Sequence, residues 1–137
     1  MNRRDQWRKH IEQKELGLEP AASRRPGSSY PQAPERAILY AVLQTLELHP
    51  KVKWVKRMNV GAMQIGNRLV RFGFPGMADI TGQMRDGRRL EVEVKRKGEQ
   101  PTLAQQAFLE LVRDTNGVAF VARSSNDVIK NLGALAR

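Results

Sequence analysis

Residues 76–97 constrain the fold of this chain most, because charged side chains alternate there with apolar ones in a pattern typical of a strand. In the run LEVEVK, the charged residues Glu91, Glu93 and Lys95 are separated by single apolar residues. Successive side chains of a strand point to opposite faces, so the three charged groups share one face and the apolar groups pack on the other. Charges on an otherwise buried strand are costly unless they are paired or hold a metal.

A further carboxylate, Asp79, lies on an apparent strand earlier in the same segment, between the apolar residues Ala78 and Ile80. Two carboxylates and a lysine that converge at a strand edge would hold a hard divalent cation through oxygen, with the ammonium beside it. The alternative is a surface strand with an ion pair between Glu93 and Lys95.

The turn between the two strands tests whether the carboxylates can meet. A two-residue loop at Asp86 and Gly87 would place Asp79 opposite Val94, on the wrong face for Glu93. A three-residue loop in which Gly87 is left-handed places Asp79 opposite Glu93. A shared metal site therefore predicts the three-residue loop, or a compensating bulge elsewhere.

These motifs resemble the PD-(D/E)XK nucleases, and most closely their virus-type replication-repair (VRR-NUC) branch. The matching residues are 76–80, 93–95 and 102–106, with 59–61 and Glu35 upstream. The resemblance covers about residues 34–132. One departure is Ala78, which stands where the superfamily name leads one to expect proline.

The resemblance implies an α/β fold with a restriction-endonuclease-like core, in which helices flank a mixed central sheet. It also implies a metal-dependent DNA endonuclease. Asp79, Glu93 and the carbonyl of Val94 would hold Mg²⁺ or Mn²⁺, and Lys95 would position the attacking water or stabilise charge on the phosphoryl oxygens. Small members of this family look like phage or bacterial junction-processing enzymes, which suggests a homodimer and four-way junction DNA.

Alternative functions remain open at this point. Within nucleases, the runner-up is a flap, nick or restriction-type duplex endonuclease. A catalytically silent DNA-binding module that retains the fold is the second class. An RNA-binding protein is a weaker idea, because aromatic residues make up only 6% of the chain.

Three residues have two interpretations each. Glu35 either complements the positive end of a helix dipole or approaches the metal as a third carboxylate. Gln105 either completes a capping box with Thr102 or points toward the catalytic site. Glu91 either binds a second ion or forms a salt bridge with Arg88 or Arg89.

The charge balance favours a polyanionic partner. Lysine and arginine number 24 against 14 acidic residues, which gives a net charge of +10. We expect a groove beside the carboxylates to bind DNA, together with two residues that follow the catalytic lysine. The candidate DNA-binding residues are Arg57, Asn59, Arg68, Arg71, Arg96 and Lys97.

Composition also limits the compartment. The absence of cysteine excludes disulfides and thiolate zinc sites. No apolar run reaches the length of a membrane span, and no secretory signal is recognisable at the N-terminus. The expectation is a cytoplasmic protein of a bacterium or a phage-infected cell, with no membrane partner.

The rest of the sequence predicts two parts. Residues 1–33 form a basic extension with a Pro/Ser-rich linker, in which a short N-terminal helix is permitted. Residues 34–137 form a nuclease-like domain. Within the domain, we expect helices over about residues 35–48, 102–115 and 126–135, and further strands over 51–60, 67–74 and 118–122. Residues 61–66 are predicted to form a turn. The strand at 118–122 is expected to lie parallel to the strand of Glu93, because a helix connects them. The apolar stripe of the first helix is predicted as Ala37, Ile38, Ala41, Val42 and Leu46.

Overall fold

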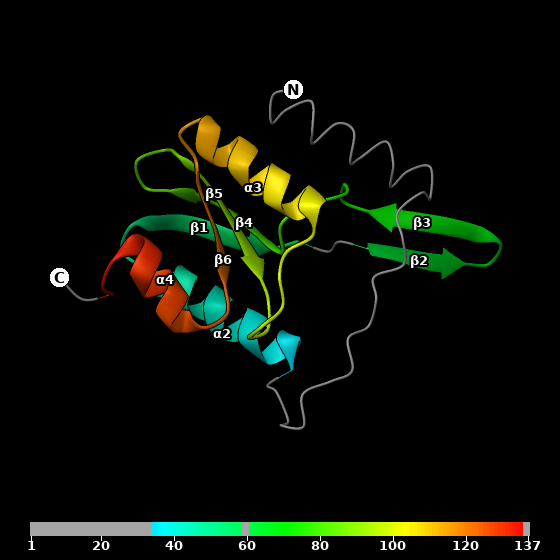
Figure 1. Ribbon diagram of the computed structural model, residues 1–137, viewed down its shortest axis with the longest axis horizontal. Helices are drawn as coiled ribbons and strands as arrows, with labels where there is room; N and C mark the ends of the chain where they lie inside the picture. Colours follow the sequence, from blue (N-terminus) through cyan, green and yellow to red (C-terminus); the bar gives the residue numbers. More distant parts are fainter. Residues whose placement is uncertain (1–33, 59–60, 136–137) are drawn as a thin grey trace.

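Four strands form a mixed sheet that lies between helices in the computed structural model, which describes residues 34–58 and 61–135 (Figure 1). The predicted N-terminal extension lies outside the described residues. In chain order the elements are α2 (Glu35–Leu48), β1 (Val52–Arg57), β2 (Gly61–Ile65), β3 (Arg68–Phe72), β4 (Ile80–Met84), β5 (Arg89–Val94), α3 (Leu103–Asp114), β6 (Val118–Ala122) and α4 (Ser125–Leu132).

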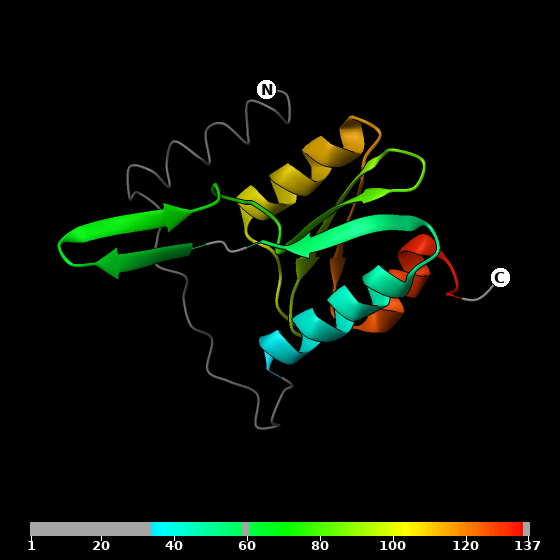
Figure 2. The ribbon, with the colours of Figure 1, turned by 180° about the vertical axis from the view of Figure 1, so that it is seen from behind.

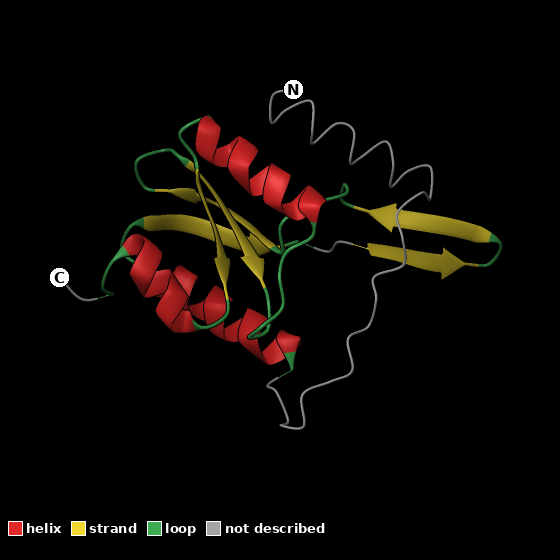
Figure 3. Cartoon of the chain, in the orientation of Figure 1, coloured by secondary structure: helices red, strands yellow, loops and turns green. Residues whose placement is uncertain are grey.

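The strand order in the sheet is β1-β4-β5-β6. The first two pairings are antiparallel, and β5 and β6 are parallel, as the connecting helix predicts. Helices α2 and α4 cover one face of the sheet, and α3 covers the other (Figures 1 and 3). The α/β class and the mixed sheet with flanking helices are therefore confirmed.

Helix α2 has the predicted bounds, because Pro34 precedes its first turn and His49 stands before Pro50, where the helical conformation is disfavoured. Its predicted stripe is partly wrong. Ala37 and Ala41 are exposed, whereas Leu39 is buried with Val42 and Leu46 at spacings of three and four residues. Small alanines need not be covered, so the larger leucine sets which face docks on the sheet.

Strand β1 departs from regular alternation of buried and exposed side chains. Val52 and Val55 are buried, whereas Trp54 is 44% exposed. The pairing of β1 with β4 shifts register between Val52 and Trp54, which is a β-bulge. An extra residue at a bulge moves the following side chains to the opposite face.

The predicted turn over residues 61–66 is wrong, because β2 occupies 61–65 and pairs with β3 in a separate hairpin. The chain reverses at Gly66, whose φ of 59° suits the left-handed conformation of a tight turn. The hairpin projects from the main sheet (Figure 2). The sequence prediction divides Gly66 and Asn67 between a turn and a strand, whereas together they form the turn of the hairpin.

The β4–β5 connection has the three-residue loop that the sequence predicts. Gly87 has a φ of 94°, and its N–H donates to the carbonyl of Met84 at 3.0 Å. Thr81 pairs with Glu91 and Ile80 with Val92, so the same register continued by one residue sets Asp79 opposite Glu93.

Helices α3 and α4 complete the fold. A capping box between Thr102 and Gln105 opens α3, and Asn116, with a φ of 66°, follows its end. Helix α4 is shorter than predicted and ends before Gly133, whose φ is 100°. Ser124 is the N-cap residue of α4, and its side chain makes no capping hydrogen bond.

Candidate active site

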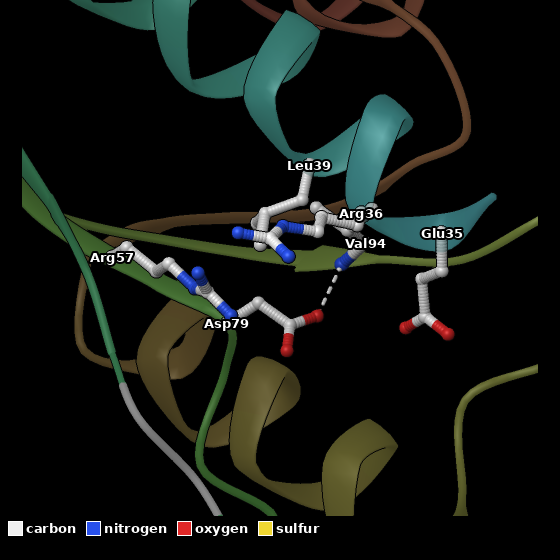
Figure 4. A pocket seen from close by; sticks show the side chains of 6 residues that line it. All are labelled: Glu35, Arg36, Leu39, Arg57, Asp79 and Val94. Carbon is white, nitrogen blue, oxygen red and sulfur yellow. Dashed lines mark hydrogen bonds between the residues drawn. The ribbon is translucent and has the colours of Figure 1, made fainter.

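Asp79 is held at the entry to β4 by contacts on both sides. Its carbonyl accepts a 2.7 Å hydrogen bond from the N–H of Met58, and its Oδ2 accepts one of 2.8 Å from the N–H of Val94 (Figure 4). The preceding turn is packed against α3 at Gly76, where an added Cβ would come within 2.5 Å of the carbonyl oxygen of Ala104. The aspartate is thus positioned by backbone groups of two strands and a helix.

Glu93 is on β5, on the face covered by α3, and only 1% exposed. Its Oε1 lies 3.3 Å from Nζ of Lys95, whose side chain is 15% exposed. Its Oε2 is buried and accepts no hydrogen bond within the described part of the chain. The ion pair of the alternative interpretation therefore exists, but the strand that carries it is not a surface strand.

The environment of Glu93 disfavours its charge. Burial, followed by the nearby negative charge of Asp79, raises the pKa of Glu93 to about 8, against the opposing effect of the Lys95 ammonium. Protonated Glu93 can donate a hydrogen bond to Asp79, whereas the ionised form cannot, and this difference also raises the pKa of Glu93. Two adjacent carboxylates, of which one is buried, are stabilised either by a proton or by a cation.

The donor set fits a hard divalent cation. Carboxylate oxygens are the ligands that Mg²⁺ prefers, and a buried Glu93 oxygen without a donor is one that a cation would satisfy. No group of three or more acidic, histidine or cysteine side chains with metal-binding geometry occurs among the described residues. Protein ligands beyond Asp79 and Glu93 would then come from backbone carbonyls such as that of Val94.

A pocket of about 390 Å³ opens beside Asp79. Figure 4 shows the side chains that line it, which are Glu35, Arg36, Leu39, Arg57, Asp79 and Val94. Glu35 lies in the first turn of α2, where it complements the helix dipole, and it also lines the pocket. It does not join the two carboxylates in a group of three.

Two arginines and a tyrosine form a cluster at this pocket. Nη1 of Arg57 lies 3.5 Å from the hydroxyl of Tyr40, and the guanidinium carbons of Arg36 and Arg57 lie 5.6 Å and 5.9 Å from the centre of its ring. A hydrogen bond with Arg36, together with both positive charges, lowers the pKa of Tyr40. Neither arginine has an ion pair with a carboxylate in the part of the chain that the structure describes. The cluster is thus suited to an anion.

Comparison of the sequence with protein-family models gives no match, and comparisons with curated proteins and with solved structures give none either. None of the helices within residues 34–58 and 61–135 is long and apolar enough to cross a membrane. A functional conclusion therefore depends on the geometry of the site and on the resemblance of its motifs.

The predicted DNA-binding residues are not all brought together. Arg57 lines the pocket, but Arg68 and Arg71 are on the β2–β3 hairpin and do not. Asn59 lies outside the described residues. Arg96 is held by Glu99, with Nε donating to Oε1 at 2.8 Å.

Lys97 is exposed beyond the end of β5. No ion pair with it occurs among the described residues, so it retains its charge for a phosphate.

For Glu91 and Gln105, the structure contains the contacts that the structural interpretation predicts. Glu91 is buried and its Oε1 accepts hydrogen bonds from Arg89 at 2.7 Å and from Thr81 at 2.6 Å, so the predicted salt bridge is to Arg89. Gln105 makes the capping box, with Oε1 accepting from the N–H of Thr102 at 2.8 Å. A catalytic role for Gln105 stays a prediction.

Sequence reasoning missed Arg36 and Tyr40. A signal was present, because residues four apart on a helix share a face and Arg36 directly follows Glu35 at the start of α2. The contribution of Arg57 to the same cluster depends on the docking of α2 against β1, which local sequence does not specify.

Proposed function

We propose that this protein is a divalent-metal-dependent endonuclease that hydrolyses DNA phosphodiester bonds, with a restriction-endonuclease-like core of the VRR-NUC type. The observation that carries the proposal is the pairing of the buried Glu93 with the half-buried Asp79, with Lys95 beside them. A structural protein gains nothing from two adjacent carboxylates, of which one is buried at the expense of its charge. A cation-binding site explains the pair.

Asp79 and Glu93 would hold Mg²⁺ or Mn²⁺, together with the carbonyl of Val94. When bound, the ion supplies a positive charge that polarises the phosphodiester and lowers the pKa of a coordinated water. The ammonium of Lys95, held 3.3 Å from Oε1 of Glu93, orients the attacking water or stabilises the charge that develops on the phosphoryl oxygens.

The walls of the pocket position the substrate. Arg36 and Arg57 bind the phosphate oxygens next to the scissile bond, because guanidinium groups match phosphate geometry and neither has a described carboxylate partner. Leu39 contributes an apolar wall at the same place. The net charge of +10 supports DNA as the partner.

Four-way junction DNA is the first candidate substrate, since the family that the motifs resemble suggests a junction-processing homodimer. The projecting β2–β3 hairpin supports the dimer. Met63 and Ile65 are more than half exposed and alternate along β2, so they share one face of a two-stranded hairpin, an element that is marginally stable alone. A second copy of the chain would cover this face.

The test is a cleavage assay with Mg²⁺ or Mn²⁺ on four-way junction, flap, nicked, duplex and single-stranded DNA. We expect metal-dependent cleavage that falls by at least about 100-fold in Glu93→Gln and Lys95→Ala, while DNA binding survives. Glu47→Gln, on the exposed face of α2, is the matched control. Binding without cleavage of any substrate would identify a catalytically silent DNA-binding module instead.

A further inference from the structure

The face of the sheet that α3 covers remains open over β1 and β4. Glu91 pairs with Ala119, which packs beneath α3, and Thr81 donates to Glu91 on the same face. Because side chains alternate, positions 83 and 89, two residues further along, also lie on this face. Gln83 pairs with Trp54 on β1, and its side chain bonds to that indole, so Trp54 belongs to the same face.

Trp54 is presented to solvent in a fixed orientation. The ring is 44% exposed, and Nε1 donates a 3.0 Å hydrogen bond to Oε1 of Gln83. It lines a second, open pocket of about 370 Å³, together with Thr81, Gly82, Gln83, Gly87 and Arg89. A large aromatic side chain held at the surface beside polar groups is a stacking surface rather than part of a core.

The groups around the indole complement a nucleotide. Gln83 uses its carbonyl oxygen for Trp54, which leaves its NH₂ to donate to a base. Arg89 uses Nε for Glu91, and Oε2 of Glu91 receives no hydrogen bond from the described residues. The terminal NH₂ groups of Arg89 are therefore not engaged with that carboxylate. Lys56 pairs with Thr81 on the same face and is exposed. The surface therefore combines a π face with cations and hydrogen-bond donors.

This surface is aligned with the candidate active site. Gln83 lies four positions along the chain from Asp79, which is about 13 Å at ~3.3 Å per residue. Lys56 and Thr81 lie in the row between them. A strand that runs along β4 from Asp79 would reach Trp54 within about four nucleotides, since duplex DNA rises ~3.4 Å per nucleotide of one strand.

We propose that Trp54, Gln83 and Arg89 form a subsite that stacks and hydrogen-bonds an unpaired base of the DNA strand cut at Asp79 and Glu93. This inference rests on the proposed nuclease function and narrows its substrate. A base inside a duplex is stacked on both sides and cannot expose its face to the indole, whereas a base in a single-stranded arm, flap or open junction can. The substrate would carry an unpaired nucleotide within about four positions of the scissile phosphate.

Fluorescence tests the contact directly, because the chain contains only two tryptophans, Trp7 and Trp54. In the full chain with Trp7→Phe and Glu93→Gln, Trp54 is the one emitter and cleavage is blocked. Titration with oligo-dT is expected to quench the emission, and a blunt duplex of equal length is expected to quench it much less. Equal quenching by both, or binding seen by anisotropy without quenching, would overturn the proposal. An indole inaccessible to acrylamide in the free chain would do so as well.

Affinity measurements distinguish the contribution of aromatic stacking from that of charge to DNA binding. Trp54→Ala is expected to weaken binding of oligo-dT about tenfold and Trp54→Phe to restore most of it, since stacking needs an aromatic ring. Leu48→Ala, at an exposed position of α2, is the control. Equal affinities for Trp54→Ala and the unsubstituted chain would contradict the subsite.

A last experiment distinguishes this proposal from the nuclease function. Single abasic sites are placed within about four nucleotides of the cut, and we expect one of them to slow cleavage by the unsubstituted chain but not by Trp54→Ala. If no substrate is cut at all, the nuclease function fails, while the quenching result still decides whether Trp54 binds an unpaired base. If cleavage occurs and no abasic position matters, the subsite alone is wrong.

Discussion

The backbone N–H of Val94 donates a 2.8 Å hydrogen bond to Oδ2 of Asp79 and so attaches this carboxylate to the strand that carries Glu93. Two groups of like charge are thereby held together by the backbone rather than by mutual attraction. The charged form of Glu93 is disfavoured, because this side chain is buried and lies next to Asp79. The proposed cation would offset the charge of both carboxylates.

The first prediction concerns the pH dependence of folding without metal. In the unfolded chain Glu93 loses its proton near its ordinary pKa of 4.5, whereas in the fold it keeps the proton up to about pH 8. The unfolded state therefore releases a proton that the folded state retains, and stability falls as the pH rises through this window. The full shift corresponds to a loss on the order of 5 kcal/mol.

Urea unfolding at about pH 5 and about pH 8.5, with a chelator present, measures this loss. Glu93→Gln has no carboxyl group to ionise at this position, so its stability should depend much less on pH. Glu47→Gln, at an exposed position, should behave like the unsubstituted chain. The same pH dependence in Glu93→Gln as in the unsubstituted chain would show that Glu93 is not the buried acid responsible.

The arginine cluster predicts a salt-dependent phenotype. Arg36→Ala and Arg57→Ala should each weaken DNA binding and reduce the slope of log K against log salt by about 0.9, the value for one lost phosphate contact. Tyr40→Phe keeps the ring and should change the slope little. Fluorescence anisotropy over a range of salt concentrations measures the effect, with Arg85→Ala in the exposed β4–β5 loop as control. Unchanged slopes would remove the two arginines from the DNA contact.

Alanine substitutions at two glycines distinguish the cost of backbone conformation from the cost of a steric overlap. Gly76 and Gly98 have φ values of 83° and 84°. An added Cβ at Gly76 would meet the carbonyl oxygen of Ala104 at 2.5 Å, whereas at Gly98 it would have no atom of the described residues within 4 Å. Gly98→Ala should lower the free energy of unfolding by about 1 kcal/mol from conformation alone. Gly76→Ala adds an overlap with backbone, which costs about 1–3 kcal/mol more. Equal losses in urea unfolding would mean that α3 does not support the turn before Asp79.

The hairpin predicts the oligomeric state. Met63→Glu should convert a dimer into monomers, because Met63 pairs with Val70 and a charge buried at this position would be unpaired. Sedimentation velocity measures the change, and Leu48→Glu, at an exposed position of α2, should leave the dimer intact. An unsubstituted chain that is monomeric at all concentrations would rule out the dimer itself.

The features that sequence predicted well depend on short-range rules. The period of two along β5 gave the polar face of Glu91 and Glu93, and the left-handed Gly87 gave the loop length and hence the position of Asp79 opposite Glu93. The start and end of α2 follow from Pro34 and Pro50 in the same way.

The features that could not be predicted from the sequence depend on tertiary contacts. The bulge in β1 exposes Trp54, and no local rule places a bulge at that residue. Arg96 has a side chain that suits a phosphate, but it is paired with Glu99. The two residues come close because the chain turns beyond β5. Arg36 and Arg57 meet around Tyr40 because α2 docks beside β1, which depends on the core as a whole.

The central claim is that Asp79 and Glu93 share one divalent cation, and calorimetric titration with Mn²⁺ tests it most directly. The unsubstituted chain should bind Mn²⁺ at this site and release a proton below about pH 8, because the ion replaces the proton on Glu93. Asp79→Asn and Glu93→Gln should each abolish this binding, and Glu47→Gln should not. Mn²⁺ affinity that is unchanged in both substituted chains would contradict the account.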